Sequence, residues 1–229
     1  GPALQGRALP YVMGAAIGNQ TAANISSLAK SGAGKWILTG NNAYTGVTNI
    51  NAGTLVLGAG GTTGSIASQT VNNFGVLGFD RSDGLTYGGV ISQTGSVDQL
   101  GAGKTTLTGT NIYTGGTTIA AGALELGAGG TTGSIVGDVA NDGRFIFNRS
   151  NTYAFTGLVS GSGELRQTGS GTTVLSAANS YGGLTNVMAG TLRINGDQSA
   201  ATGLTTVYSG ATLGGAGTIG GDVIVQNGG

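Results

Sequence analysis

The sequence predicts an all-β protein, a right-handed parallel β-helix (β-solenoid) of about ten coils. Three observations predict this fold. One long segment occurs three times in tandem, short apolar runs recur inside each copy at steps of roughly 20 residues, and glycine, asparagine, serine and threonine fill the spaces between the runs.

The long repeat is visible in matched segments. The run GKWILTG at 34–40 returns as GKTTLTG at 103–109 and more loosely as GTTVLS at 171–176. The run GAGGTTGSI at 58–66 returns unchanged at 127–135. The offsets are 69 residues (34 to 103) and 68 residues (103 to 171). We therefore expect an irregular segment at 1–24, in which Gly1-Pro2 is an expression scar, and one β-helix domain over 25–229, with repeats at about 34–102, 103–170 and 171–229.

Within each repeat, three apolar runs each follow a glycine, at Gly34, Gly53 and Gly75 in the first copy. The runs alternate, as in Thr54-Leu55-Val56-Leu57, which indicates short strands with one buried face. The steps of 19, 22 and 28 residues are too short for strand–helix–strand units of about 30 residues. We therefore interpret one repeat as three coils of uneven length, each stacked about 4.8 Å above the last.

Stacking is what would stabilise such a chain. A single coil buries too little apolar surface to offset backbone ordering at about 1–2 kcal/mol per residue, whereas stacked coils share one core. We expect Leu55, Leu77, Leu124 and Leu192 to point inward. Glycine and asparagine at the corners are expected to supply positive φ angles, and the region before Ile25 to cover the amino-terminal edge.

The composition narrows the possible functions. The chain has 229 residues, a net charge of zero and only 8% charged residues, which argues against nucleic-acid binding. It has neither histidine nor cysteine, so the usual general base and the usual zinc ligands are missing. We therefore expect no cofactor. No apolar run approaches the roughly 20 residues of a membrane span.

The segment 28–55, with GKWILTGNNAYTG at its centre, resembles the passenger-associated transport repeat of bacterial autotransporters. The tail GATLGGAGTIGGDV at 210–223 is similar to the β-helix that precedes the carboxyl-terminal chaperone and barrel regions of such passengers. The third copy departs from the pattern, since Gly182 follows Tyr181 where the others have threonine. The resemblance implies export across the outer membrane of a Gram-negative bacterium and display at the cell surface. Membrane attachment would occur only through a carboxyl-terminal barrel outside this sequence.

Two sets of recurring polar residues are candidate site residues. Tyr44, Tyr113 and Tyr181 could form an aromatic row that grips a glycan. Three coils, about 14 Å, would separate them, so they could not stack, and structural tyrosines at corners are the better interpretation. The second set, Asn42, Asn111 and Asn179, is also interpreted as corner residues.

Asp80-Arg81-Ser82-Asp83 is the densest charge cluster. Carboxylates on a β-helix could bind calcium or act as a glycosidase pair. The matching segment 148–151 reads NRSN, with amides in place of both acids. We therefore expect a solvated loop, and no catalytic, cofactor-binding or metal site.

The leading functional hypothesis is a non-catalytic passenger segment that acts as an adhesin, a self-association module or a rigid stalk. Its partners would be a host-cell surface, matrix or glycan receptor, or itself on neighbouring cells, and not nucleic acid. The alternative is a carbohydrate-active β-helix enzyme, a lyase or glycosidase, that uses Asp80, Asp83 or Asp98.

Overall fold

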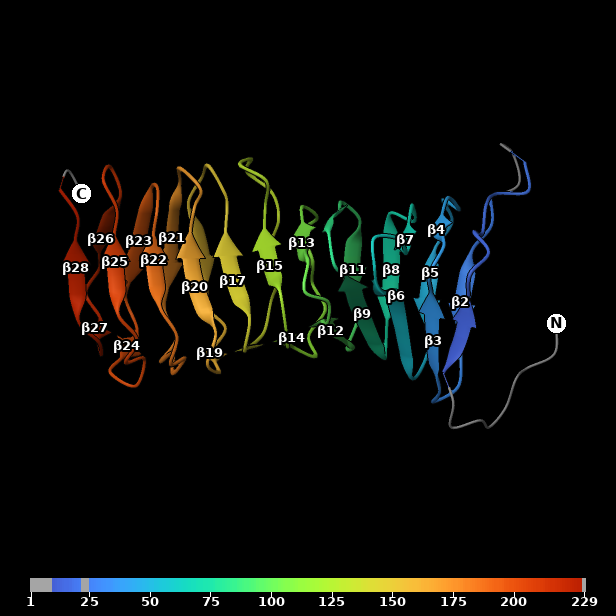
Figure 1. The fold of residues 1–229 in the computed structure, drawn as a ribbon, viewed down its shortest axis with the longest axis horizontal. Helices are drawn as coiled ribbons and strands as arrows, with labels where there is room; N and C mark the ends of the chain where they lie inside the picture. Colours follow the sequence, from blue (N-terminus) through green and yellow to red (C-terminus); the bar gives the residue numbers. More distant parts are fainter. Residues whose placement is uncertain (1–9, 22–24, 228–229) are drawn as a thin grey trace.

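The computed structural model describes residues 10–21 and 25–227, and it is a rod in which coil follows coil from one end to the other (Figure 1). Gly1 and Pro2 lie outside the described residues. The described part contains strands and turns without a helix, and all the strand pairs found in it are parallel. The expected parallel β-helix of about ten coils is therefore confirmed. No helix able to cross a membrane occurs in the described residues.

Each coil has three faces, because successive strands join different sheets in a fixed order. Face 1 carries the sheets β11-β8-β5-β2 and β18-β21-β23-β26; face 2 carries β1-β3-β6-β9-β12-β14-β16-β19 and β24-β27; face 3 carries β4-β7 and β10-β13-β15-β17-β20-β22-β25-β28.

The strand bounds on face 1 are β2 Leu28–Lys30, β5 Thr48–Ile50, β8 Thr70–Asn73, β11 Val90–Ser92, β18 Tyr153–Phe155, β21 Thr172–Leu175, β23 Thr191–Ile194 and β26 Thr212–Gly214. Those on face 2 are β1 Tyr11–Met13, β3 Lys35–Leu38, β6 Thr54–Gly61, β9 Val76–Arg81, β12 Ser96–Gln99, β14 Thr117–Ile119, β16 Val139–Asn141, β19 Val159–Ser160, β24 Asp197–Gln198 and β27 Thr218–Ile219. Those on face 3 are β4 Asn41–Asn42, β7 Ser65–Ile66, β10 Gly84–Tyr87, β13 Lys104–Leu107, β15 Ala123–Leu126, β17 Arg144–Phe147, β20 Glu164–Gln167, β22 Thr185–Val187, β25 Thr205–Val207 and β28 Val223–Val225.

The interpretation of one repeat as three uneven coils is wrong. The three runs of the first repeat are β3, β6 and β9 on face 2, but their counterparts are β13, β15 and β17 on face 3 and β21, β23 and β26 on face 1. The 28-residue step from Gly75 to Gly103 contains a full coil, from Val76 to its partner Ser96, and then a move to the next face. One repeat is thus three coils and about a third of a coil, and each repeat is rotated by one face relative to the last.

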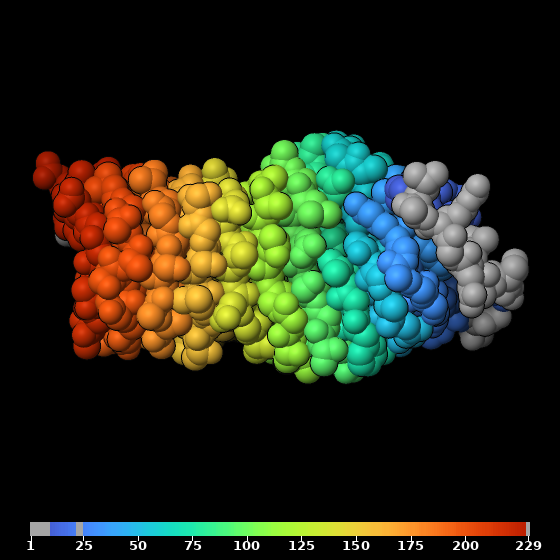
Figure 2. Space-filling model, turned by 90° about the horizontal axis from the view of Figure 1, so that it is seen from below, coloured from blue at the N-terminus to red at the C-terminus, as the bar shows by residue number. Residues whose placement is uncertain are grey.

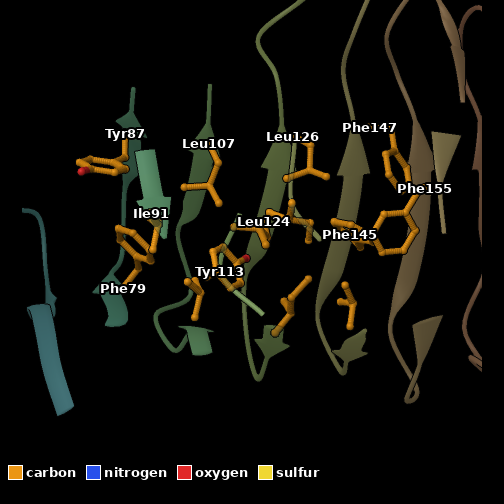
Figure 3. Packing of buried hydrophobic residues seen from close by; sticks show 14 of the residues in the cluster. Phe79, Tyr87, Ile91, Leu107, Tyr113, Leu124, Leu126, Phe145, Phe147 and Phe155 are labelled. Carbon is orange, nitrogen blue, oxygen red and sulfur yellow. The ribbon is translucent and has the colours of Figure 1, made fainter. Parts of the chain in front are cut away.

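The core is a continuous column of inward side chains. Leu55, Leu77, Leu124 and Leu192 are each 0% exposed, which confirms their expected direction. The register places Leu55 beside Leu77 and Leu124 beside Phe145. Figure 3 shows Leu124, Phe145 and Phe155 directed into the space between the strands, and the rings of Phe145 and Phe155 meet edge to face at 5.6 Å.

Corners rely on glycine and not on asparagine for positive φ. Gly53 and Gly122 have φ angles of 68° and 61°. A Cβ on either glycine would lie within 2.5 Å of a carbonyl oxygen of the preceding coil. Glycine is therefore required at both positions for two reasons, the positive φ and the lack of room for a side chain. Among the described residues, Gln93 is the one non-glycine with positive φ. The expected role of asparagine in setting φ is therefore wrong, and its hydrogen bonds explain its position instead.

The two ends of the described rod differ. β1 pairs with β3, so Tyr11–Met13 cover the edge of that strand and belong to the stack ahead of the boundary expected at Ile25. At the other end Val223, Ile224 and Val225 of β28 are 43%, 50% and 59% exposed. Figure 2 shows the rod wider in its teal and green part than in its yellow part.

Candidate functional site

The recurring tyrosines are inside the rod. Tyr44, Tyr113 and Tyr181 are at most 2% exposed, and each hydroxyl lies 2.7 Å from the Oγ1 of the threonine four residues later. Burial raises the pKa of Tyr44 to about 12. Because each repeat is rotated by one face, the three rings also belong to different sides of the rod. They therefore do not form an aromatic row for a glycan.

Asn42 and Asn111 each connect three successive coils, whereas Asn179 connects two. Asn111 Oδ1 accepts a hydrogen bond from the Ile91 amide of the preceding coil at 2.9 Å, and its Nδ2 donates to Ser134 O of the following coil at 3.0 Å. Asn42 makes the same pair of contacts, with Ile17 and Ser65. Asn179 accepts from the Val159 amide at 2.7 Å. These side chains are buried structural bridges.

The charge cluster at 80–83 holds the base of the glycine-rich loop at 58–64. Arg81, 9% exposed, donates to the carbonyl oxygens of Thr62 and Gly64. Asp83 binds the same guanidinium through both carboxylate oxygens, at 2.8 and 2.9 Å, and this hydrogen bond lowers the pKa of Asp83. The cluster is therefore an ordered clamp and not a simple solvated loop.

The second repeat has the same clamp, but a neutral asparagine replaces the aspartate that binds the arginine. Arg149 donates to the carbonyl oxygens of Thr131 and Gly133, and Asn151 replaces the aspartate as the acceptor of its Nε. The third repeat has neither the GAGGTTG run nor a matching arginine. Loop and clamp are thus present or absent together, and the clamp works without a carboxylate, because Asn151 accepts the arginine hydrogen bond in the second repeat.

The remaining candidate acids lie on face 2. Asp98 on β12 pairs in register with Gly78 of β9, and Asp80 follows two residues after Gly78. Burial raises the pKa of Asp98. The structure thus brings Asp80 and Asp98 to neighbouring coils of one sheet and commits Asp83 to Arg81. Within the part of the chain that the structure describes, no three acidic residues gather as a possible metal site.

Sequence reasoning missed a buried polar position that also recurs at the repeat offset. Lys30 is 0% exposed, and its Nζ donates to Gly32 O at 2.6 Å and to Ala52 O at 2.9 Å. Its counterparts Gln99 and Gln167 donate to glycine carbonyls in the same way, each with a first bond of 2.8 Å. The matching offsets could have revealed this position, but the change from lysine to glutamine hid it.

Two carboxylates on the outer side of face 3 were also missed. Glu125 accepts from Lys104 Nζ at 2.6 Å, and from Asn148 and Thr106 at 2.9 Å. Glu164 accepts from Arg144 at 3.0 Å and from Arg166 at 2.5 Å. Burial acts to raise the pKa of each glutamate, but these hydrogen bonds outweigh it and hold the pKa below its ordinary value.

Comparison with known proteins adds three findings. The family model for the passenger-associated transport repeat matches residues 28–57, 97–126 and 165–194, which begin on faces 1, 2 and 3 in turn. The chain is 40% identical over 209 residues to the protein named "Adhesin BmaC autotransporter" of Brucella suis biovar 1 (strain 1330), an alignment that covers 82% of this chain and 6% of that protein. No solved structure matches the chain.

Proposed function

This chain is a segment of an autotransporter passenger with three passenger-associated transport repeats, and we propose that it is an adhesive part of the longer protein to which it belongs. Membership of this family implies export across the outer membrane to the cell surface. The chain spans only 6% of the length of the curated relative that it matches. What we propose is therefore that this particular stretch is itself adhesive.

The similarity to a named adhesin over 82% of the chain carries the proposal. The architecture supports it, because a rod of stacked coils presents polar surface on three faces over its whole length. Many weak contacts along such a surface combine into firm attachment when they act at once. The partner could be a host-cell or matrix receptor, or a second copy on a neighbouring cell.

Bead attachment tests this function directly. Beads coated with the purified chain should attach to host cells or matrix-coated surfaces, or cluster with one another, more than beads coated with an unfolded control such as Leu124→Asp. Equal attachment by both bead types would contradict the adhesive function and would indicate that this stretch only spaces other parts of the protein.

One observation favours the carbohydrate-active alternative, namely the raised pKa of Asp98 in a coil next to Asp80, since a glycosidase needs one protonated carboxyl group. The assay is cleavage of polysaccharides by the purified chain. Activity that disappears in Asp98→Asn and Asp80→Asn would favour an enzyme, and its absence in the parent chain would argue against one.

A further inference from the structure

Phe74 is placed differently from every other phenylalanine in the chain. Phe79, Phe145, Phe147 and Phe155 are at most 2% exposed, whereas Phe74 is 51% exposed. It follows β8 directly at the corner between faces 1 and 2, and its amide donates to Ile50 O at 2.8 Å. The backbone is therefore fixed while half of the ring surface remains in solvent.

The other repeats show that the fold does not need an aromatic ring at this corner. The counterpart of Phe74 in the second repeat is Asp142, whose amide donates to Ile119 O in the same way. Asp142 Oδ1 accepts from the amide and the hydroxyl of Ser162 in the next coil, at 2.9 and 2.8 Å. In the third repeat the matching residue is Ser209. Phe74 thus replaces a polar corner residue and cannot form the carboxylate bonds of Asp142.

A second residue with an unfavourable feature, a positive φ outside glycine, lies at the same corner. The coil after Phe74 contains one extra residue, because Ser92 pairs with Asn72 while the Gly95 amide donates to Asn73 O. The second repeat has the same arrangement and places Gly161 there, with φ 97°. The first repeat has Gln93, with φ 80° and an exposed side chain. Strain of this kind in a non-glycine residue concentrates at functional sites.

A row of two amides and one hydroxyl lies next to these two residues on the outer side of face 1. Asn49, Asn72 and Ser92 are register partners on three successive coils. Asn72 Nδ2 donates to Asn49 Oδ1 at 2.8 Å, and Ser92 Oγ lies 3.4 Å from Asn72 Oδ1. All three side chains are half-buried, so the row is ordered and still reachable from solvent.

We propose that Phe74, Gln93, Asn72 and Asn49 form a contact surface for a neutral carbohydrate, with the sugar ring stacked on Phe74 and its hydroxyls hydrogen-bonded to the amides. The proposal rests on the adhesive function proposed above and gives that function a ligand class.

The chemistry of the surface favours a neutral sugar over other partners. None of the four side chains carries charge, so an anionic or cationic ligand gains nothing there. A single exposed ring offers far less apolar area than the roughly 800 Å² that each partner buries in a stable protein interface. A pyranose ring has one apolar face and a rim of hydroxyls, and amides supply both donors and acceptors for that rim.

The test measures binding of the purified chain to immobilised oligosaccharides of glucose, galactose, mannose and N-acetylglucosamine, with oligogalacturonate as a charged comparison. The parent chain should bind at least one neutral probe. Phe74→Ser, which installs the residue type of the third repeat, should weaken that binding by about tenfold or more at an unchanged melting temperature. Leu184→Ser is the matched control, because Leu184 is 49% exposed and lies several coils away from Phe74, directly before β22 on face 3, and it should bind as the parent does.

Gln93→Gly separates a ligand contact from a structural effect. Relief of positive φ should raise the melting temperature, and loss of the side chain should weaken sugar binding. A higher melting temperature with unchanged binding would remove Gln93 from the surface. Unchanged binding in Phe74→Ser, binding of oligogalacturonate alone, or no binding of any neutral probe by the parent would overturn the proposal. Sugar binding by a chain whose beads do not attach to cells would contradict the adhesive function and leave the sugar surface standing.

Discussion

Lys30, Gln99 and Gln167 occupy equivalent positions in the three repeats. All three donate hydrogen bonds to backbone carbonyl oxygens, the lysine through its ammonium group and the glutamines through their amides. At each position carbonyl oxygens at a corner require a donor from inside the rod, and an ammonium or an amide supplies it. The ammonium is the costlier solution, because burial lowers the pKa of Lys30 and so disfavours its charged form.

Lys30→Gln should therefore fold normally and be at least as stable as the parent at neutral pH. Since the folded-state pKa lies below the ordinary 10.5, the unfolded chain binds the proton more tightly, and the parent should gain stability relative to the variant as pH rises toward that value. Lys30→Met removes the donor and should cost about 1–3 kcal/mol. Urea unfolding at several pH values checks this, and a methionine variant as stable as the glutamine variant would contradict it.

Arg81→Ala should loosen the loop at 58–64, because the carbonyl oxygens of Thr62 and Gly64 lose their charged donor. We expect faster cleavage within this loop by a broad-specificity protease and a stability loss of roughly 1–3 kcal/mol. Arg193→Ala, at an exposed arginine, is the control and should leave both unchanged. Equal cleavage of the two variants would show that the clamp does not order the loop.

At the scale of strands, the outer side of face 3 is held by charge pairs between neighbouring coils. Lys104, Glu125 and Asn148 come from three successive coils, and Arg144, in the same coil as Asn148, pairs with Glu164 of the next coil. Partners about 20 residues apart in sequence meet only because the parallel register places them side by side. Together with the apolar core, these contacts specify the register in which neighbouring strands pair.

The stability of the rod should fall as pH drops below about 4.5, because the pKa values of Glu125 and Glu164 are held below that ordinary value. A carboxylate with a depressed folded-state pKa contributes its stability above the unfolded pKa and loses it as pH falls through the folded one. Thermal melts between pH 7 and pH 3 should show a smaller decline for the double variant Glu125→Gln, Glu164→Gln. Parallel declines in both proteins would exclude these pairs as the cause.

The strands and the inward rows could be predicted, because alternation and repeat spacing are local properties of the sequence. Leu55 and Leu124 show this, since both occur in short runs with one apolar face. The partners of Arg81 and Glu125 could not be predicted, because they depend on which coil lies above which. The repeat offset already aligns Phe74 with Asp142 and Gln93 with Gly161, but only the structure shows that the ring is exposed and that Gln93 has a positive φ.

For the whole molecule, stability is a sum over stacked coils that share one core. Leu124→Asp places a charge at a fully buried position and should unfold several coils together, at a cost of several kcal/mol. Circular dichroism should show a large loss of strand signal or a much lower melting temperature. Ala154→Asp, at an exposed position on β18 of face 1, is the control, and equal melts of both variants would place Leu124 outside the core.

The rotation of each repeat by one face decides how the rod presents its surface. Ala43 and Ile112 are exposed counterparts in the first two repeats, yet they lie on different faces, so a feature that recurs in every repeat is displayed around the rod and not along one line. Partners on several sides could then be bound at once.

The separation of spin labels at Ala43→Cys and Ile112→Cys measures this rotation most directly, and the chain has no cysteine of its own to interfere. Coils of about 20 residues at roughly 3.3 Å per residue have a perimeter of about 66 Å, so a shift of one face combined with about 16 Å of rise predicts a separation of roughly 25 Å or more. Electron spin resonance distances in that range would support the account. A distance near 14 Å, the rise of three whole coils in a straight stack, would contradict it.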